Sequence, residues 1–222
     1  MLLLGVQFQI IGGIIAALAT PESGATGRGL SAEDRNGLHL GLMHIVGALA
    51  CVATTAYFCR IRRGPPIAEY LAIRWPGWRA MILWGAAAAA VPLIRTEGLR
   101  LLGYVVEPDY WRNVLETAGH PALLLFGVVI AAPLMEETVF RGFLYAGLAP
   151  TRLGHLGAVV VTTALWLLPH VQYDEAELCV LAASGLLLGI VRWRTGSTVA
   201  AFLVHGVMNA VEMSSVMRAV WS

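Results

Sequence analysis

The chain has 222 residues, of which 58% are hydrophobic and 13% are charged, and its mean hydropathy is +0.71. A soluble domain carries about a quarter charged residues, so this composition excludes one and predicts a polytopic membrane protein. The formal net charge of +1 gives no basis for a nucleic-acid partner or a strongly acidic partner.

The predicted helices are the apolar runs that can cross a hydrocarbon core of about 30 Å. In chain order they lie at 2–19, 38–58, 79–94, 121–149, 155–171, 177–191 and 197–217. They predict an all-α fold, in which residues 1–222 form a single transmembrane domain of about seven helices. The stretch "LRLLGYVV" at 99–106 is either an interfacial helix or part of an eighth span.

The first run, "MLLLGVQFQIIGGIIAALA", has a secretory signal peptide as its alternative interpretation. Its end, Ala17-Leu18-Ala19, has the small residues of a cleavage site, but no basic region precedes the apolar run. We therefore expect a retained first membrane helix.

Loop charges predict the orientation, because cytoplasmic loops collect lysine and arginine. Three arginine-bearing connections alternate with neutral or acidic ones: the segment 59–79, the turn after 149 with Arg152, and the turn after 191 with Arg192 and Arg194. The loop 20–37 and the segment "QYDEAE" carry the acidic residues. The pattern predicts a multi-pass protein with a cytoplasmic N-terminus. Its membrane is the cell (inner) membrane or, as the alternative, an organelle membrane that follows the same rule.

Few ionisable or strongly polar residues lie inside these spans. An ionisable group in a span costs at least a few kcal/mol, so each one is a functional hypothesis. They are Glu136, Glu137 and Arg141 on the fourth run, His170 at the end of the fifth, and His205, Asn209 and Glu212 on the last.

The depths of these groups in the bilayer predict that three helices bring them together. At a rise of about 1.5 Å per residue from the cytoplasmic ends, Glu136 and His170 lie about 20 Å and about 22 Å deep. His205 and Asn209, counted in the same way, lie about 12 Å and about 18 Å deep. The polar groups therefore converge near the middle of the membrane.

The spacing of the residues separates supporting from reactive groups. Glu137 and Arg141 stand at i and i+4, which predicts an ion pair that fixes helix packing. Glu136 is rotated by about 100° from Glu137, so it either faces other helices or becomes a second partner of Arg141. His205 and Asn209 also stand at i and i+4, which suits oxyanion stabilisation or an interhelical hydrogen bond.

At these residues the sequence resembles the CAAX protease and bacteriocin-processing enzymes, the Abi or Rce1-like intramembrane proteases. The motif E-E-x-x-x-R is matched by "EETVFR" at 136–141, and H-x-x-x-N by "HGVMN" at 205–209. The second motif, aromatic-x-x-x-H, is matched by "WLLPH" at 166–170, although it usually begins with Phe and here begins with Trp166. We expect the aromatic packing role to survive that change. The resemblance covers about residues 121–215, the expected protease core.

The resemblance implies that Glu136 and His170 activate a water that attacks a peptide carbonyl, while His205 and Asn209 stabilise the oxyanion. It implies that Glu137 and Arg141 support the site, and that no cofactor is needed. The residues alone leave a zinc site of Glu136, His170 and His205 as an alternative, although the sequence has no H-E-x-x-H motif. The three other histidines considered, His44, His120 and His155, lie near span ends or in loops and receive no role.

The expected function is an intramembrane endopeptidase that acts near the terminus of a membrane-associated protein or peptide. A prenylated CAAX protein, a leader peptide and a C-terminal sorting tag are the substrate alternatives that the family offers. The bilayer and such a peptide are the expected partners. The competing classes are a non-catalytic immunity or scaffold protein and a small proton-coupled transporter, although no internal repeat favours the transporter.

Overall fold

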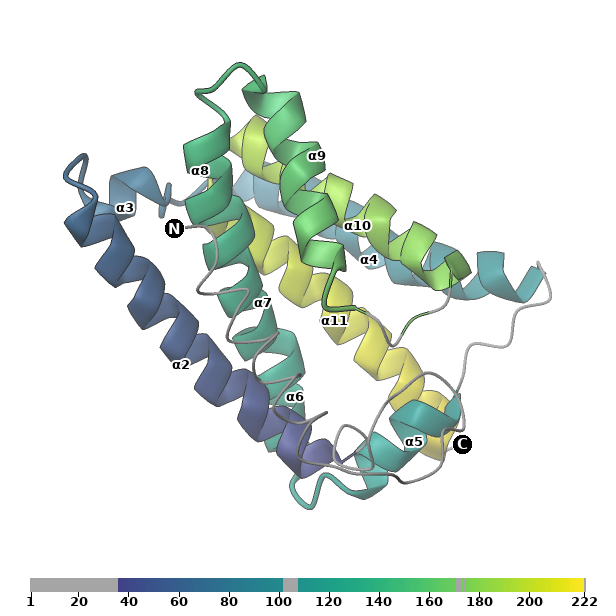
Figure 1. Ribbon diagram of the computed structural model, residues 1–222. Helices are drawn as coiled ribbons and strands as arrows, with labels where there is room; N and C mark the ends of the chain where they lie inside the picture. Colours follow the sequence, from purple (N-terminus) through teal and green to yellow (C-terminus); the bar gives the residue numbers. More distant parts are fainter. Residues whose placement is uncertain (1–35, 102–107, 171–172, 174, 222) are drawn as a thin grey trace.

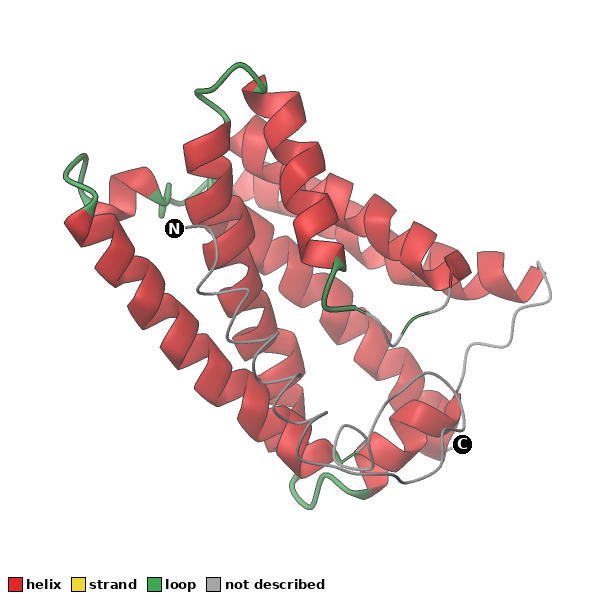
Figure 2. Cartoon of the chain, in the orientation of Figure 1, coloured by secondary structure: helices red, strands yellow, loops and turns green. Residues whose placement is uncertain are grey.

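The computed structural model describes residues 36–101, 108–170, 173 and 175–221, and within them every regular element is a helix (Figures 1 and 2). The first predicted run, 2–19, and most of 99–106 lie outside the described residues. The elements before the long central run are α2 (Gly37–Ile61), α3 (Ile67–Tyr70), α4 (Trp78–Leu101) and α5 (Pro108–Glu116). Those after it are α9 (Gly154–Leu167), α10 (Glu175–Thr195) and α11 (Thr198–Trp221).

The predicted run 121–149 is a continuous helical segment in which α-helical and π-helical stretches alternate. It consists of α6 (Pro121–Phe126), the π-helix η1 (Gly127–Ala131), α7 (Ala132–Glu136), the π-helix η2 (Glu137–Leu144) and α8 (Tyr145–Leu148). Pro121 suits the first turn, where its missing N–H is not needed. Pro150 follows the end, since proline cannot continue a helix. Glu136 and Glu137 therefore stand on either side of the junction between α7 and η2, and π-helical turns occur frequently at functional sites.

The described residues confirm a helix at each of the other predicted runs, but they do not establish the number of spans. Four helices are long and apolar enough to cross a membrane: Gly37–Ile61, Pro121–Leu148, Glu175–Thr195 and Thr198–Arg218. The helix Gly154–Leu167 is apolar but shorter, and it ends two residues before Pro169. The count of seven or eight spans therefore stays a prediction.

Apolar side chains cover much of the outer surface of the bundle. On α2, Leu42, Val46 and Leu49 are 45%, 63% and 70% exposed, and on α4 Ile82 and Leu83 are 64% and 66% exposed. A soluble monomer rarely exposes such continuous apolar faces, whereas lipid tails solvate them. The chain is an integral, multi-pass membrane protein.

Helix α11 occupies the centre of the bundle and packs against α4, α10 and the 121–148 run, while α2 lies along the outer side of that run (Figure 1). Lipid offers little hydrophobic driving force between helices, so close approach of small residues matters more than apolar burial. Gly185 and Gly189 show this on α10. A Cβ atom at Gly185 would lie 2.9 Å from the Trp166 ring, and one at Gly189 would lie 2.7 Å from Val159 Cγ1 on α9.

Two of the arginine-bearing connections, the segment 59–79 and the turn after 191, contact each other at one end of the bundle. The Nε of Arg74 donates to the Gly196 carbonyl at 2.7 Å, and the Thr198 amide donates to the Ala72 carbonyl at 3.1 Å. Arg62 lies 3.6 Å over the ring of Tyr70, whose hydroxyl donates to the Phe143 carbonyl and whose pKa is raised by burial. The shared end agrees with the predicted alternation of loops, and its cytoplasmic side stays a prediction.

Arg192 was predicted to lie in the turn after residue 191, but the structure places it within a helix. Helix α10 continues to Thr195, so Arg192 lies in its last turn and is only 8% exposed. Its Nε donates to the Arg141 carbonyl at 2.9 Å, and its guanidinium lies 4.8 Å from the centre of the Tyr145 ring. This arginine therefore joins α10 to η2 inside the bundle, while Arg194 is exposed.

Candidate active site

Glu137 and Arg141 form the buried ion pair that their spacing predicts. Both side chains are 0% exposed, and Arg141 Nη1 lies 3.1 Å from Glu137 Oε1. Arg141 Nη2 donates to the Gly185 carbonyl on α10 at 2.9 Å. Glu137 Oε2 and Arg141 Nε have no hydrogen-bond partner among the described residues. The two side chains thus share one contact, and Arg141 joins η2 to α10 through the Gly185 carbonyl.

His205 connects both glutamates to α11. Its Nδ1 lies 2.9 Å from Glu137 Oε1, and its Nε2 lies 3.9 Å from Glu136 Oε2. A carboxylate accepts hydrogen bonds, so Nδ1 carries the proton that faces Glu137. Glu137 thereby fixes the orientation of the imidazole, and Nε2 points toward the second carboxylate.

Glu136 faces away from the ion pair and receives a hydrogen bond from Trp166. The indole Nε1–H donates to Glu136 Oε2 at 2.5 Å, and 13% of the glutamate side chain is exposed. No hydrogen bond reaches Oε1 of Glu136 among the described residues. Among the described residues, Glu136 makes polar contacts with Trp166 and His205 and none with Arg141. Glu136 is therefore not a second partner of Arg141 in this part of the chain.

Trp166 therefore does more than pack, which was the role expected of an aromatic residue at this position. Its ring is 2% exposed and packs with Phe140 and Leu144 of η2. Phenylalanine, the usual residue of the motif, would fill such a cluster but has no N–H to donate. The exchange of Phe for Trp thus adds a hydrogen bond to Glu136.

His170 lies just beyond α9 and turns back onto that helix. Its Nδ1 lies 2.8 Å from the Trp166 carbonyl, and its ring centre lies 4.8 Å from that of the indole. A carbonyl only accepts, so Nδ1 carries a proton and Nε2 is the free basic nitrogen of the neutral ring. Glu136 acts electrostatically on both His170 and His205, and the two histidines act on each other, so the three groups lie within electrostatic range of one another.

Asn209 lies one turn after His205 on α11 and faces the π-helical stretch η1. Its Nδ2 donates to the Val128 carbonyl at 2.9 Å. A primary amide has two N–H groups, so one remains for another acceptor.

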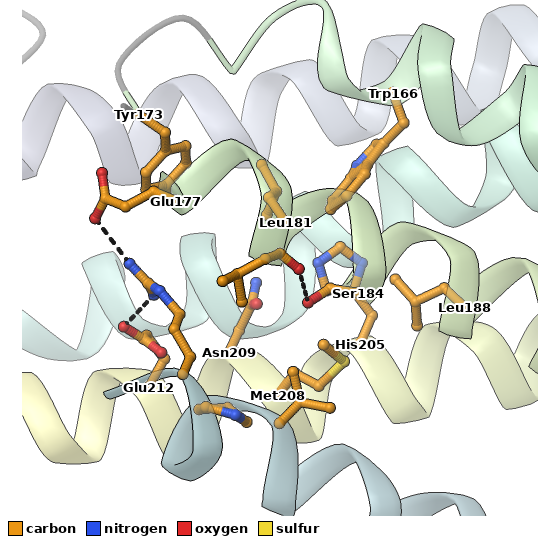
Figure 3. A pocket seen from close by; sticks show the side chains of 14 residues that line it. Trp166, Tyr173, Glu177, Leu181, Ser184, Leu188, His205, Met208, Asn209 and Glu212 are labelled. Atoms are coloured by element: carbon orange, nitrogen blue, oxygen red, sulfur yellow. Dashed lines mark hydrogen bonds and ion pairs between the residues drawn. The ribbon is translucent and has the colours of Figure 1, made fainter. Parts of the chain in front are cut away.

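A cavity of about 90 Å³ adjoins these residues. Its lining includes the site residues Trp166, His205 and Asn209 and the charged residues Arg95, Glu177 and Glu212. In Figure 3, Trp166 and His205 lie toward one end of the cavity and Glu177 and Glu212 toward the other. Glu136 and His170 are not among its lining residues. Such a volume holds a few water molecules at about 30 Å³ each, so a peptide needs additional space.

Arg95 is a charged residue of the cavity that the sequence interpretation missed. Its Nη1 lies 2.6 Å from Glu212 Oε1 and its Nη2 lies 3.1 Å from Glu177 Oε1. The predicted third run ends at residue 94, so Arg95 lies just outside it, although α4 continues to Leu101. One arginine therefore joins α4, α10 and α11, and Glu212 lines the cavity as part of this cluster.

We expect Arg95→Met to lower the stability of the fold. Hydrogen bonds to charged groups contribute about 1.5–3 kcal/mol, and the change leaves two carboxylates facing each other at 20–21% exposure. The measurement is the midpoint of thermal unfolding in detergent. The triple variant with Glu177→Gln and Glu212→Gln should regain part of the loss, and a triple variant less stable than Arg95→Met alone would contradict this account.

Among the described residues, no group of three His, Cys, Asp or Glu side chains is arranged to hold a metal ion. The zinc alternative of Glu136, His170 and His205 thus has no preformed ligand cluster in the part of the chain that the structure describes.

Comparison with known protein families identifies the part of the chain that carries these residues. Residues 118–211 match the family model of the Rce1-like type II CAAX prenyl endopeptidases. The chain contains an Rce1-like domain. This domain includes all three sequence motifs and extends from the turn before α6 into α11, so the resemblance found in the sequence is confirmed. No curated protein and no solved structure matches the chain.

The family of this model is one of peptidases, as the description of the model says. The match begins at residue 118, so α2 and α4 lie outside it. Both helices nevertheless contact the candidate site, α2 through the 121–148 run and α4 through Arg95.

Proposed function

We propose that this protein is an intramembrane endopeptidase that hydrolyses a peptide bond near the terminus of a membrane-associated protein or peptide. The observation that supports it most is the environment of Glu136. One carboxylate oxygen is held by Trp166 Nε1, while Glu136 Oε1 is free of hydrogen bonds from the described residues and His170 acts on the same carboxylate. A carboxylate fixed at one oxygen and open at the other is suited to deprotonate a water.

Glu136 and His170 together are the proposed water-activating pair. The oxygen of the water attacks the peptide carbonyl carbon as one of its protons passes to Glu136. Glu136 then gives that proton to the amide nitrogen as the C–N bond breaks and the amine departs. His170 can accept a hydrogen bond from the same water at Nε2, since its Nδ1 is committed to the Trp166 carbonyl. Water can therefore be oriented by two groups on different helices before it attacks.

His205 and Asn209 are the proposed oxyanion donors. When both ring nitrogens of His205 carry protons, Nδ1 donates to Glu137 and Nε2 is available for the developing negative charge. Asn209 has one N–H left beside its bond to Val128. Donors fixed before the reaction stabilise a tetrahedral intermediate without reorganisation, and Glu137 and Arg141 supply that rigidity.

The direct test is mass spectrometry of membrane proteins from three cell lines: one that contains the chain, one that lacks it, and one with Glu136→Gln. We expect a set of proteins whose termini shift only in the first line. An unchanged set of termini would refute the peptidase, and solute uptake that is lost with the same variant would instead indicate a transporter. The affected proteins identify the substrate class among prenylated proteins, leader peptides and sorting tags. Cleavage should continue in the presence of a chelator.

The hydrogen bond between Trp166 and Glu136 gives a second, narrower prediction. Trp166→Phe keeps the aromatic packing and removes the donor, and a hydrogen bond to a charged group contributes about 1.5–3 kcal/mol. We expect the cleavage rate to fall by about tenfold to about a hundredfold with little change in thermal stability. A Phe variant with the wild-type rate would show that the indole only packs.

A further inference from the structure

His44 is a partly buried imidazole near the candidate site, and the sequence gave it no role. It lies on α2, and its Nδ1 is buried without a hydrogen-bond partner among the described residues. Helix α2 packs along α7 and η2, the two stretches that meet between Glu136 and Glu137 (Figure 1). A buried polar atom without a partner is uncommon in folded proteins and calls for an explanation.

Two residues of the candidate site act electrostatically on this ring. They are Glu136 on α7 and His170 after α9. On its own helix the Leu40 carbonyl faces the ring as a weak hydrogen-bond acceptor, although no hydrogen bond of good geometry forms at Nδ1. No direct hydrogen bond joins His44 to Glu136 among the described residues. Two polar groups that share no direct hydrogen bond can be joined by a water between them.

The surroundings of His44 argue against a packing role alone. Its buried neighbours on the same helix are Gly41, Ala48 and Cys51, so this face of α2 is otherwise small and apolar. Leucine would pack there without any polar group to satisfy. An ionisable residue inside a membrane helix is retained for a reason other than packing in most cases.

We propose that His44 is a positioning residue of the candidate site, which holds the free oxygen Oε1 of Glu136 through one water. Trp166 fixes one carboxylate oxygen and His44 fixes the other, so the carboxylate is oriented from α9 and from α2. The site then extends beyond the Rce1-like domain, since α2 precedes residue 118. The effect on rate rests on the proposed peptidase function, whereas the contact between His44 and Glu136 does not.

Three substitutions of His44 distinguish the effect of its polar nitrogen atoms on the rate from the effect of its side-chain volume. His44→Leu retains much of the volume and removes both nitrogens, His44→Asn keeps a polar atom near the position of Nδ1, and His44→Gln keeps one near Nε2. We expect kcat to fall by about tenfold in the Leu variant, the effect of one hydrogen bond, while KM is unchanged. At least one of the polar variants should regain most of the rate. A Leu variant as fast as the wild type overturns the proposal, and so do polar variants that are both as slow as Leu.

A second measurement requires no cleavage. In protein labelled with ¹⁵N-histidine, the resonances of His44 are assigned by their loss in the His44→Asn variant. They should shift in Glu136→Gln and stay unchanged in Glu175→Gln, which alters an exposed carboxylate at the start of α10. His44 resonances that do not respond to Glu136→Gln would overturn the proposal even if the protein proves to be a peptidase. A response in a protein without peptidase activity would support the contact while the proposed function fails.

Discussion

Glu136→Gln is expected to abolish most of the cleavage without unfolding the protein. Glutamine has nearly the same volume, and its carbonyl oxygen can still accept the hydrogen bond from Trp166 Nε1. It cannot take a proton from water at neutral pH, and a positioned general base contributes about 10²–10⁴-fold to a rate. We therefore expect kcat to fall by about that factor in purified, reconstituted protein.

The control variant is Glu116→Gln, which makes the same change at an exposed carboxylate on α5. It should leave the cleavage rate unchanged. Thermal unfolding of both variants should match the wild type, since Glu136 is not part of the buried ion pair. Cleavage by Glu136→Gln within a few-fold of the wild type would show that another group activates the water. Loss of folding together with activity would instead assign Glu136 a structural role.

The sequence predicts the central residues of this site because the membrane-spanning segments around them consist almost entirely of apolar residues. Glu136, His205 and Asn209 stand out there for the same reason that they are costly, namely that an apolar medium does not solvate them. The ion pair of Glu137 and Arg141 follows from a spacing of four residues on one helix. These inferences need only the chain position and the helical repeat, so they hold without knowledge of how the helices are arranged.

Contacts between helices that are far apart in the sequence cannot be predicted from chain position and the helical repeat alone. His44 on α2 and Arg95 on α4 are isolated polar residues, and only the packing of the bundle brings them near Glu136 and Glu212. Arg192 was attributed to a loop because the end of its helix is uncertain by a few residues. The role of Trp166 was missed because an aromatic motif position describes ring packing and not the direction of an indole N–H.

Arg141→Met is expected to be the most destabilising single change in the chain among those argued here. Glu137 is 0% exposed, so removal of its cation leaves a buried carboxylate whose remaining partner is His205. Removing one member of a buried ion pair costs about 3–5 kcal/mol, a large share of the roughly 5–15 kcal/mol that stabilises a domain. The same change frees the Gly185 carbonyl on α10. We expect a much lower midpoint of thermal unfolding in detergent and a small yield of folded protein.

The double variant Glu137→Gln with Arg141→Met shows whether the buried charge is the cause. Glutamine is neutral and its oxygen still accepts from His205 Nδ1, so the double variant removes the ion pair without leaving a charge unpaired. Its loss of stability should be clearly smaller than that of Arg141→Met alone, because coupled residues are not additive. A double variant as unstable as the single one would assign the effect to the guanidinium's own contacts with Gly185 and with the Trp166 ring, 5.1 Å away. In that case the function of Arg141 would be to join η2 to α9 and α10, with Glu137 present mainly to orient His205.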